Sequence, residues 1–223
     1  MLRLSLIVLL ALAGCAGNSA TDQQTLVDRA TLTVQEMFIA QNGGDTRKLL
    51  RDAKGAMVCP RIFKAGFIVG GQGGGCVLVG RDASGNFTNP AFYGLGSGSV
   101  GLQIGVQDAE IVFIILTEKG LRALLDSQFK IGADASIAVA SIGTGVSGAT
   151  TAALRADIVA FAQARGLFAG ISVDGTLISS RSDWNASYYG KPLAAQQIVL
   201  GGEGQNQGAD PLREMLAKYA SGQ

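Results

Sequence analysis

Three basic residues flank the first predicted strands of the chain, and their side chains could bind phosphate. Arg61 and Lys64 follow the first strand pattern, and Arg81 follows the third. If these strands pair as a hairpin, the three charges would gather at one end of the sheet and contact the headgroups of anionic lipids. Ordinary solvated charge at strand ends is the alternative, and the three residues alone favour that interpretation.

The residue types of the chain exclude most catalytic chemistry. It contains no histidine, which rules out histidine triads, histidine metal sites and imidazole acid–base catalysis. Asp157 and Asp183 are isolated carboxylates, and no serine lies in a nucleophile-elbow sequence. The run Gly70–Gly75 lacks the Lys-Ser/Thr of a phosphate-binding loop, so a glycine hairpin or a close backbone crossing explains it better. We therefore predict no catalytic residue, no cofactor and no metal site.

Two cysteines follow Cys15, namely Cys59 and Cys76. An oxidising compartment such as the periplasm permits a disulfide between them. Two buried free thiols, which behave as small apolar side chains, are the alternative. Because spacing along the chain does not establish proximity in space, the spacing of these residues leaves both interpretations open. Two cysteines by themselves cannot supply the four ligands of a structural zinc site.

The N-terminus has the layout of an export signal. A short segment with the single charge Arg3 precedes the apolar run Leu6–Ala13, which is too short to cross a bilayer. Leu12-Ala13-Gly14-Cys15 follows and resembles the lipobox of bacterial lipoproteins, in which the cysteine is acylated and becomes the mature N-terminus. We predict that residues 1–14 are removed and that Cys15 carries acyl chains such as palmitate. An ordinary signal peptide that contains a cysteine is the alternative.

The predicted mature protein consists of a short tether, residues 15–21, and a single domain, residues 22–223. Ala16 stands where aspartate retains enteric-type lipoproteins in the inner membrane. By that analogy we expect the protein at the outer membrane of the bacterial envelope, facing the periplasm. Removal of residues 1–14 deletes one basic and no acidic residue, which leaves 17 basic and 17 acidic side chains. This balance provides no net positive field to attract nucleic acid.

Helical periodicity is confined to the two ends of the mature chain and to one internal segment. Thr21 and Gln24 resemble a capping box for the first helix, and Thr117 can cap the internal one. Pro60 is expected to end the first strand, the glycine run to join the next two, and Asp82–Gly85 to form a turn. The apolar segment Ile111–Leu116 should be a buried central strand. The predicted helices cover residues 26–38, 45–53, 118–126 and 209–220, and the predicted strands cover residues 56–59, 65–70, 76–80, 100–106, 111–116, 136–142, 157–164 and 168–173.

The order of these elements indicates the fold class. Strands dominate the middle of the chain, and helices do not alternate with them as crossovers, which argues against a doubly wound parallel sheet. We predict an α+β fold with a curved, mostly antiparallel sheet or barrel-like core, N-terminal helices and a C-terminal helix.

Several motifs, in order along residues 25–205, resemble the SYLF domain family. They are Lys64–Gly71, Pro90–Phe92, Ser99–Gly105, Ile131–Ser136, Arg165–Ser172 and Tyr188–Gly190. Members of this family are similar in lipid binding, eukaryotic members engage phosphoinositides and assist actin-associated membrane remodelling, and bacterial members are mostly exported. The resemblance implies lipid binding here, although the phosphoinositide headgroup does not carry over to bacteria. Cys76 and Cys59 stand where the family usually has a small and an aliphatic residue, which suggests a local disulfide.

Together these observations predict a non-enzymatic, membrane-tethered protein that binds membrane lipid. Anionic headgroups would meet Arg61, Lys64 and Arg81. A structural envelope protein that binds a protein partner through its sheet edge or C-terminal helix is the alternative. An enzyme acting on lipid or cell wall is disfavoured by the missing histidine and the missing acid pair, and the oligomeric state stays open.

Overall fold

The computed structural model describes residues 19–40, 44–66, 69–100, 105–141, 155–166 and 175–222. Cys15, the predicted signal segment and the predicted strand at residues 168–173 lie outside these ranges. The described elements are α1 (Ala20–Ala40), α2 (Gly44–Asp52), β1 (Gly55–Gly66), β2 (Val69–Gly80), β3 (Ala91–Val100), β4 (Gly105–Ile115), α3 (Glu118–Leu125), β5 (Gln128–Lys130), β6 (Ile137–Ser141), β7 (Ile158–Gly166), β8 (Leu177–Ser180), α5 (Ser182–Tyr189), α6 (Ala195–Val199), a 3₁₀ turn (Gln207–Ala209) and α7 (Asp210–Ser221).

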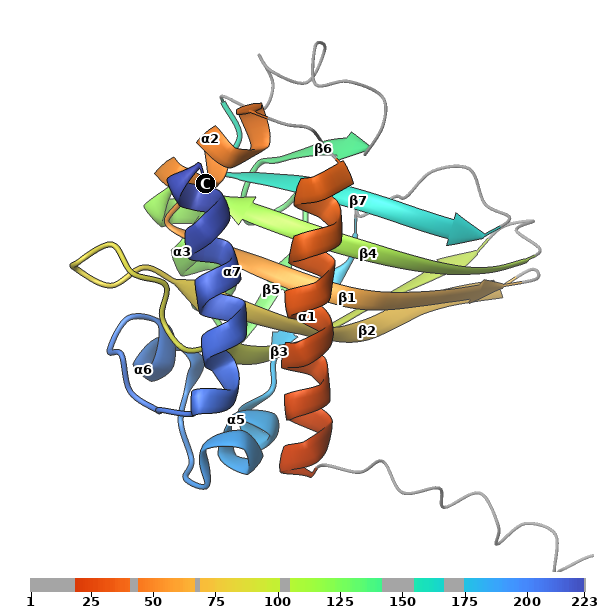
Figure 1. Cartoon of the computed structure of the whole chain (residues 1–223). Helices are drawn as coiled ribbons and strands as arrows, with labels where there is room; N and C mark the ends of the chain where they lie inside the picture. The colour runs from red at the N-terminus through yellow and green to blue at the C-terminus, as the bar shows by residue number, and fades with distance from the viewer. Residues whose placement is uncertain are drawn as a thin grey trace, which may run out of the picture.

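Eight strands form one curled sheet in the order β5-β8-β3-β2-β1-β4-β7-β6. All neighbours are antiparallel except β6 and β7, which are parallel. Helices α1 and α7 lie across one face of the sheet (Figure 1). The predicted α+β fold, with a curved and mostly antiparallel sheet between N-terminal and C-terminal helices, is confirmed.

Alternating side chains of the central strands build two cores, one on each face of the sheet. In β1, Ala56 and Val58 pack toward the helices α1, α2 and α7, whereas Met57 and Cys59 pack into the core on the other face, with α3 and α6. This alternation follows from the two-residue repeat of a strand. Strand β4 has buried residues on both faces, as expected for a central strand, and lies between β1 and β7.

The first helix begins earlier than predicted, because its cap lies upstream of Thr21. Ser19 N donates to Asp22 Oδ2 at 3.1 Å, and Asp22 N donates to Ser19 Oγ at 3.3 Å. This reciprocal pair satisfies two helix-terminal N–H groups. The helix therefore starts at Ala20, inside the segment predicted as tether.

Two predictions about the first hairpin are wrong. Strand β1 continues through Pro60 to Gly66, because the register of its pairing with β2 and with β4 shifts near Pro60. Such a bulge interrupts the hydrogen-bond ladder, so a residue without an N–H is tolerated there. The run Gly70–Gly75 lies within β2 rather than joining two strands. A Cβ on Gly74 would lie 2.1 Å from the carbonyl oxygen of Arg61, so the glycine allows the bulged backbone to approach.

The remaining local predictions hold in part. The turn at Asp82–Gly85 is present, with a positive φ of 83° at Gly85. Of the strand predicted at residues 100–106, Val100 ends β3, residues 105–106 begin β4, and residues 101–104 lie outside the described ranges. Thr117 caps α3 through a hydrogen bond from Gly120 N. The short elements β5, β8, α5 and α6, which carry little periodicity, were not predicted, and neither was β3 over residues 91–99.

Asp157 supports the start of α3. Its carboxylate accepts hydrogen bonds from Thr117 Oγ1 at 2.7 Å and from Ser136 N at 3.0 Å, and it pairs with Lys119 Nζ at 3.3 Å. The hydrogen bonds from Thr117 and Ser136, with Lys119, hold the pKa of Asp157 well below its usual range. The group is thus an ionised structural acceptor.

Candidate functional site

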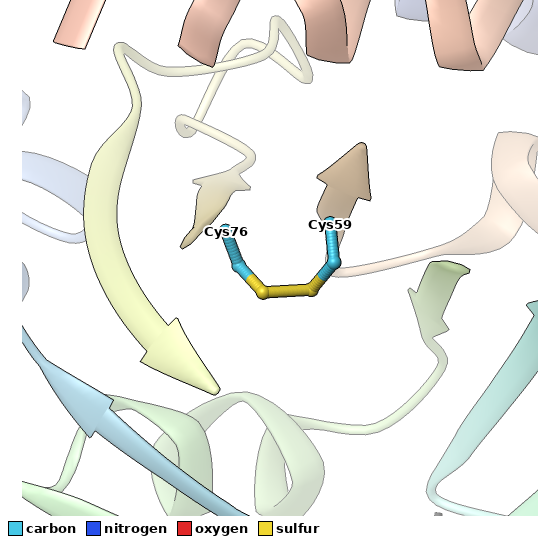
Figure 2. The surroundings of a disulfide bond; sticks show 2 residues. All are labelled: Cys59 and Cys76. Atoms are coloured by element: carbon cyan, nitrogen blue, oxygen red, sulfur yellow. A yellow bond between two sulfur atoms is a disulfide. The ribbon is translucent and has the colours of Figure 1, made fainter. Parts of the chain in front are cut away.

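A disulfide joins Cys59 of β1 to Cys76 of β2 (Figure 2). The neighbouring residues Val58 and Val77 are cross-strand partners, which places the two cysteines opposite one another. Both are fully buried in the core on the α3 face. The bond therefore links the two central strands beside the bulge and is not exposed as part of a surface site.

The three basic residues singled out in the sequence do not gather at one place. Arg61 and Phe63 project to the α1 face of the sheet, and Lys64 alternates to the opposite face. Arg81 follows Gly80, whose cross-strand partner is Gly55, at the far end of β1. At about 3.3 Å per residue, Lys64 and Arg81 are roughly 30 Å apart along the strand.

Arg81 is half-buried and bound to backbone. Its Nε donates to Ala53 O at 3.0 Å, and its Nη2 donates to Leu50 O at 3.0 Å. Its guanidinium also lies 4.2 Å from the ring centre of Phe87. Burial lowers the pKa of Arg81, partly offset by Asp52. The side chain connects the end of α2 to the turn after β2.

Arg61 is exposed and lies on the surface beside α1. Its Nε donates to Asp108 Oδ1 at 3.0 Å and its Nη2 to Asp108 Oδ2 at 3.3 Å. The hydrogen bond and charge of Asp108 raise the pKa of Arg61. Because the pair is solvated, its guanidinium can exchange this partner for another anion at little cost.

Strands β1, β2, β4 and β7 extend beyond α1 on the side away from α7 (Figure 1). Two hollows lie where α1 meets this bare part of the sheet, and both contain Arg29, Pro60 and Arg61. We name the hollow toward β2 the glycine groove and the hollow toward β7 the polar groove. Together they border α1 along much of its length.

The glycine groove has a volume of about 690 Å³. Its floor is the backbone of Gly73–Gly75, and its apolar walls are Leu26, Phe63 and Trp184, with Asp22, Gln23, Thr25, Arg29, Pro60 and Arg61 completing the lining. The polar groove, of about 410 Å³, contains Leu32, Thr33, Glu36, Asp108, Ala109, Glu110 and Gln163 besides the three shared residues. The two grooves therefore differ in character and meet at Arg29 and Arg61.

Exposed apolar side chains surround this junction. Phe63 is 44% exposed, Leu32 on α1 is 57% exposed, and Val106 on β4 is 54% exposed. Among the described residues, Arg29 has no ion-pair partner. Basic and apolar groups thus share this surface with the acidic side chains of Glu36, Asp108 and Glu110.

Sequence reasoning missed Arg29, Gln23 and Trp184 as members of this site. Arg29 and Gln23 lie on the predicted first helix, and Trp184 lies on α5, which was not predicted. Three positions of α1, Gln23, Leu26 and Arg29, recur at helical spacing and could have indicated a common helix face. No local signal connects that face to Gly73 or Trp184.

In the part of the chain that the structure describes, no helix is both long and apolar enough to span a bilayer. None of the clusters of Cys, Asp and Glu in this part of the chain has the three members needed to hold a metal ion.

Comparison with known proteins gives a consistent group of relatives. The chain is 29% identical over 175 residues to Protein YSC84 of Saccharomyces cerevisiae, covering 77% of this chain and 37% of that protein. It is 27% identical over 184 residues to SH3 domain-containing YSC84-like protein 1 of Rattus norvegicus, covering 81% of this chain and 54% of the relative. This chain thus spans from about a third to about half of the length of these relatives. No solved structure matches it.

The family model described as "Ysc84: Las17-binding protein actin regulator" matches residues 96–219, which is more than half of the chain. The matched segment runs from the exposed half of β3 through the central strand β4 to α7. It thus includes strands that form the bare end of the sheet as well as Trp184 of the glycine groove. The order of the sequence motifs agrees with this match, and the chain belongs to the Ysc84 family, also called the SYLF family.

Proposed function

We propose that this protein is an exported lipoprotein of the bacterial envelope, anchored through Cys15, and that its SYLF domain binds anionic lipid without catalysing a reaction. The outer membrane, with the domain facing the periplasm, is the proposed location. The observation that carries the lipid-binding part is the surface on which Arg29 and Arg61 adjoin exposed Phe63, Leu32 and Val106.

The physical argument for this surface is the pairing of two kinds of attraction. Guanidinium groups bind phosphate through charge-assisted hydrogen bonds, but exposed contacts of this kind are screened by salt. Apolar side chains that enter the boundary between headgroups and acyl chains add an attraction that salt does not screen. Lys64 is left out of the proposed surface because its side chain lies on the opposite face of the sheet. Arg81 is left out of the proposed surface because backbone carbonyls occupy its guanidinium.

The test is binding to vesicles by the chain from residue 16 onward, which removes the acyl anchor. We expect binding to phosphatidylglycerol vesicles, weak binding to phosphatidylcholine vesicles, and weaker binding as salt rises. Since each basic residue near an anionic surface contributes about 1 kcal/mol, Arg29→Glu/Arg61→Glu should reduce the affinity about tenfold or more. Cosedimentation at two salt concentrations measures this.

The matched control reverses two exposed charges on other elements, Arg122→Glu on α3 and Lys130→Glu on β5. It changes the net charge by the same amount and should retain most of the vesicle binding. If the control variant loses as much vesicle affinity, the change in net charge alone explains the effect. Equal binding to neutral and anionic vesicles would refute the headgroup part of the proposal.

The anchor is tested separately by intact-mass analysis of the protein purified from bacterial membranes. We expect an N-terminus at Cys15 that carries acyl chains, and loss of membrane attachment in Cys15→Ser. A mass that corresponds to an unmodified Cys15 thiol, or to retention of Met1, would defeat this part of the proposal.

Binding of a protein partner is the second candidate function. The printed names of relatives include "LAS seventeen-binding protein 3" of Saccharomyces cerevisiae, which is 29% identical over 175 residues. One observation favours it: β6 forms one end of the strand order and exposes 43% of Val139, and an edge strand can pair with another chain. A single dominant protein adduct after crosslinking in cells would favour this candidate over lipid binding.

A further inference from the structure

The glycine groove differs from the surrounding surface because it is hollow, has the apolar walls Leu26, Phe63 and Trp184, and is lined in part by Gln23, a buried residue with a polar atom that has no partner. Gln23 is 2% exposed, and its Oε1 accepts no hydrogen bond in the described structure. A buried acceptor without a donor costs free energy that a bound donor would recover. Its place in the groove lining therefore points to a ligand with a hydroxyl or N–H group.

The walls of the groove indicate an apolar ligand body. Leu26 of α1 and Trp184 of α5 both lie over Gly75, since a Cβ there would be 2.9 Å from Leu26 Cδ2 and 3.1 Å from Trp184 Cζ3. Phe63 lines the groove from β1. The volume of about 690 Å³ falls within the usual range of small-molecule sites, roughly 300–1,000 Å³. Because Gly73 has no side chain, the chain of an apolar ligand can lie against the backbone of the groove floor.

The charges and the tryptophan distinguish between ligand classes. Arg29 and Arg61 at the rim favour an anionic group, whereas Asp22 is engaged by the N–H and hydroxyl of Ser19. The guanidinium of Arg181 lies 4.2 Å from the ring centre of Trp184 and covers one face of the ring. That face is closed to a sugar ring, and the indole presents its edge atom Cζ3 to the groove floor at Gly75, where an aliphatic chain fits better than a stacked carbohydrate.

We propose that the glycine groove binds one acyl chain of an anionic lipid, with the headgroup at Arg29 and Arg61 and a headgroup hydroxyl donating to Gln23 Oε1. This inference rests on the proposed lipid binding and deepens it. The domain would then take single lipid molecules from solution or from a membrane, in addition to adsorbing to a membrane surface.

Trp184 is the only tryptophan of the chain and therefore reports directly on the groove. The probe is lysophosphatidylglycerol with a brominated acyl chain, used below its micelle concentration, because bromine quenches tryptophan only at close range. The protein is residues 15–223 with Cys15→Ser. We expect saturable quenching by this probe, no quenching by inorganic phosphate, and no displacement of the probe by inorganic phosphate at constant ionic strength.

Two glycines of the same strand face provide a matched pair of variants. Gly73→Leu places a side chain in the groove, and its Cβ meets only Leu95 O, at 3.4 Å. Gly71→Leu lies two residues away, outside the groove, and its Cβ meets only Ser97 O, at 3.6 Å. We expect Gly73→Leu to weaken probe binding at least tenfold and Gly71→Leu to stay within twofold of the parent protein.

Each outcome decides between the inference and the function on which it rests. Absence of quenching, or equal affinity of both variants for the probe, would overturn the proposal that the glycine groove binds an acyl chain. Vesicle binding through Arg29 and Arg61 could persist in either case. Quenching without vesicle binding would overturn the proposed membrane surface and keep the groove. If Gly73→Leu fails to fold, photolabelling of the parent protein by a diazirine-bearing lysolipid replaces it. Adducts are expected within residues 22–29, 60–63 and 73–75 and at Trp184, and adducts confined to other segments would refute the inference.

Discussion

Removing the disulfide between Cys59 and Cys76 is expected to lower the free energy of unfolding by about 3 kcal/mol. The bond joins two cysteines with a sequence separation of 17 residues. In the chain-entropy account, closing a loop of this size lowers the entropy of the unfolded chain and thereby destabilises the unfolded state by about that amount. Both cysteines are fully buried between the central strands β1 and β2. The affected hairpin also carries Arg61 and the floor of the glycine groove.

The experiment compares urea unfolding of the parent protein and of Cys59→Ala/Cys76→Ala, each with and without reductant. We expect the midpoint of the oxidised parent to fall on reduction and that of the double variant to stay unchanged. Because Cys15 is the remaining cysteine of the double variant, any response of that variant isolates effects of Cys15. A parent protein whose unfolding is the same in both redox states would indicate two buried free thiols instead.

Arg81→Ala is expected to destabilise the fold by about 2–4 kcal/mol, because charged hydrogen bonds contribute roughly 1.5–3 kcal/mol each and the carbonyls left behind are partly buried. The guanidinium donates to the carbonyls of Leu50 and Ala53 at 3.0 Å and to that of Arg51 at 3.4 Å. Carbonyls at the end of a helix have no intrahelical partner. The arginine thus caps α2 from a distant part of the chain.

A second arginine serves as the matched control for this measurement. Arg61→Ala removes an exposed ion pair, and such pairs contribute between zero and about 1 kcal/mol. Arg81→Lys keeps the charge but lacks the planar fork, so its stability should lie between those of the parent and Arg81→Ala. Urea unfolding by circular dichroism measures all three. If Arg81→Ala is no less stable than Arg61→Ala, the capping role is refuted.

The long amphipathic elements were predictable from the sequence because their signals are local. The apolar stretch in β4, the Thr117 cap of α3 and the apolar face of α7 each depend on residues within one or two turns or one strand. Such periodicity identifies an element and its buried side. The order of helices and strands then indicated the α+β fold and its antiparallel sheet.

The sequence alone could not place the candidate site. The bulge at Pro60 changes which side chains of β1 face α1, so Arg61 rather than Lys64 lies on the α1 side. A shift of one residue reverses the face of every later side chain in a strand. Arg81 does not lie beside Arg61 and Lys64, because β1 and β2 pair over their full length and Arg81 follows the far end of this hairpin.

Sequence by itself therefore determined the class of fold, the family and the buried strand. Tertiary structure decided the pairing of Cys59 with Cys76, the capping role of Arg81 and the groove formed by Gln23, Gly73 and Trp184. The physical reason is distance along the chain. Periodicity and capping act between near neighbours, whereas a groove between α1, β2 and α5 exists only after the sheet has packed against both helices.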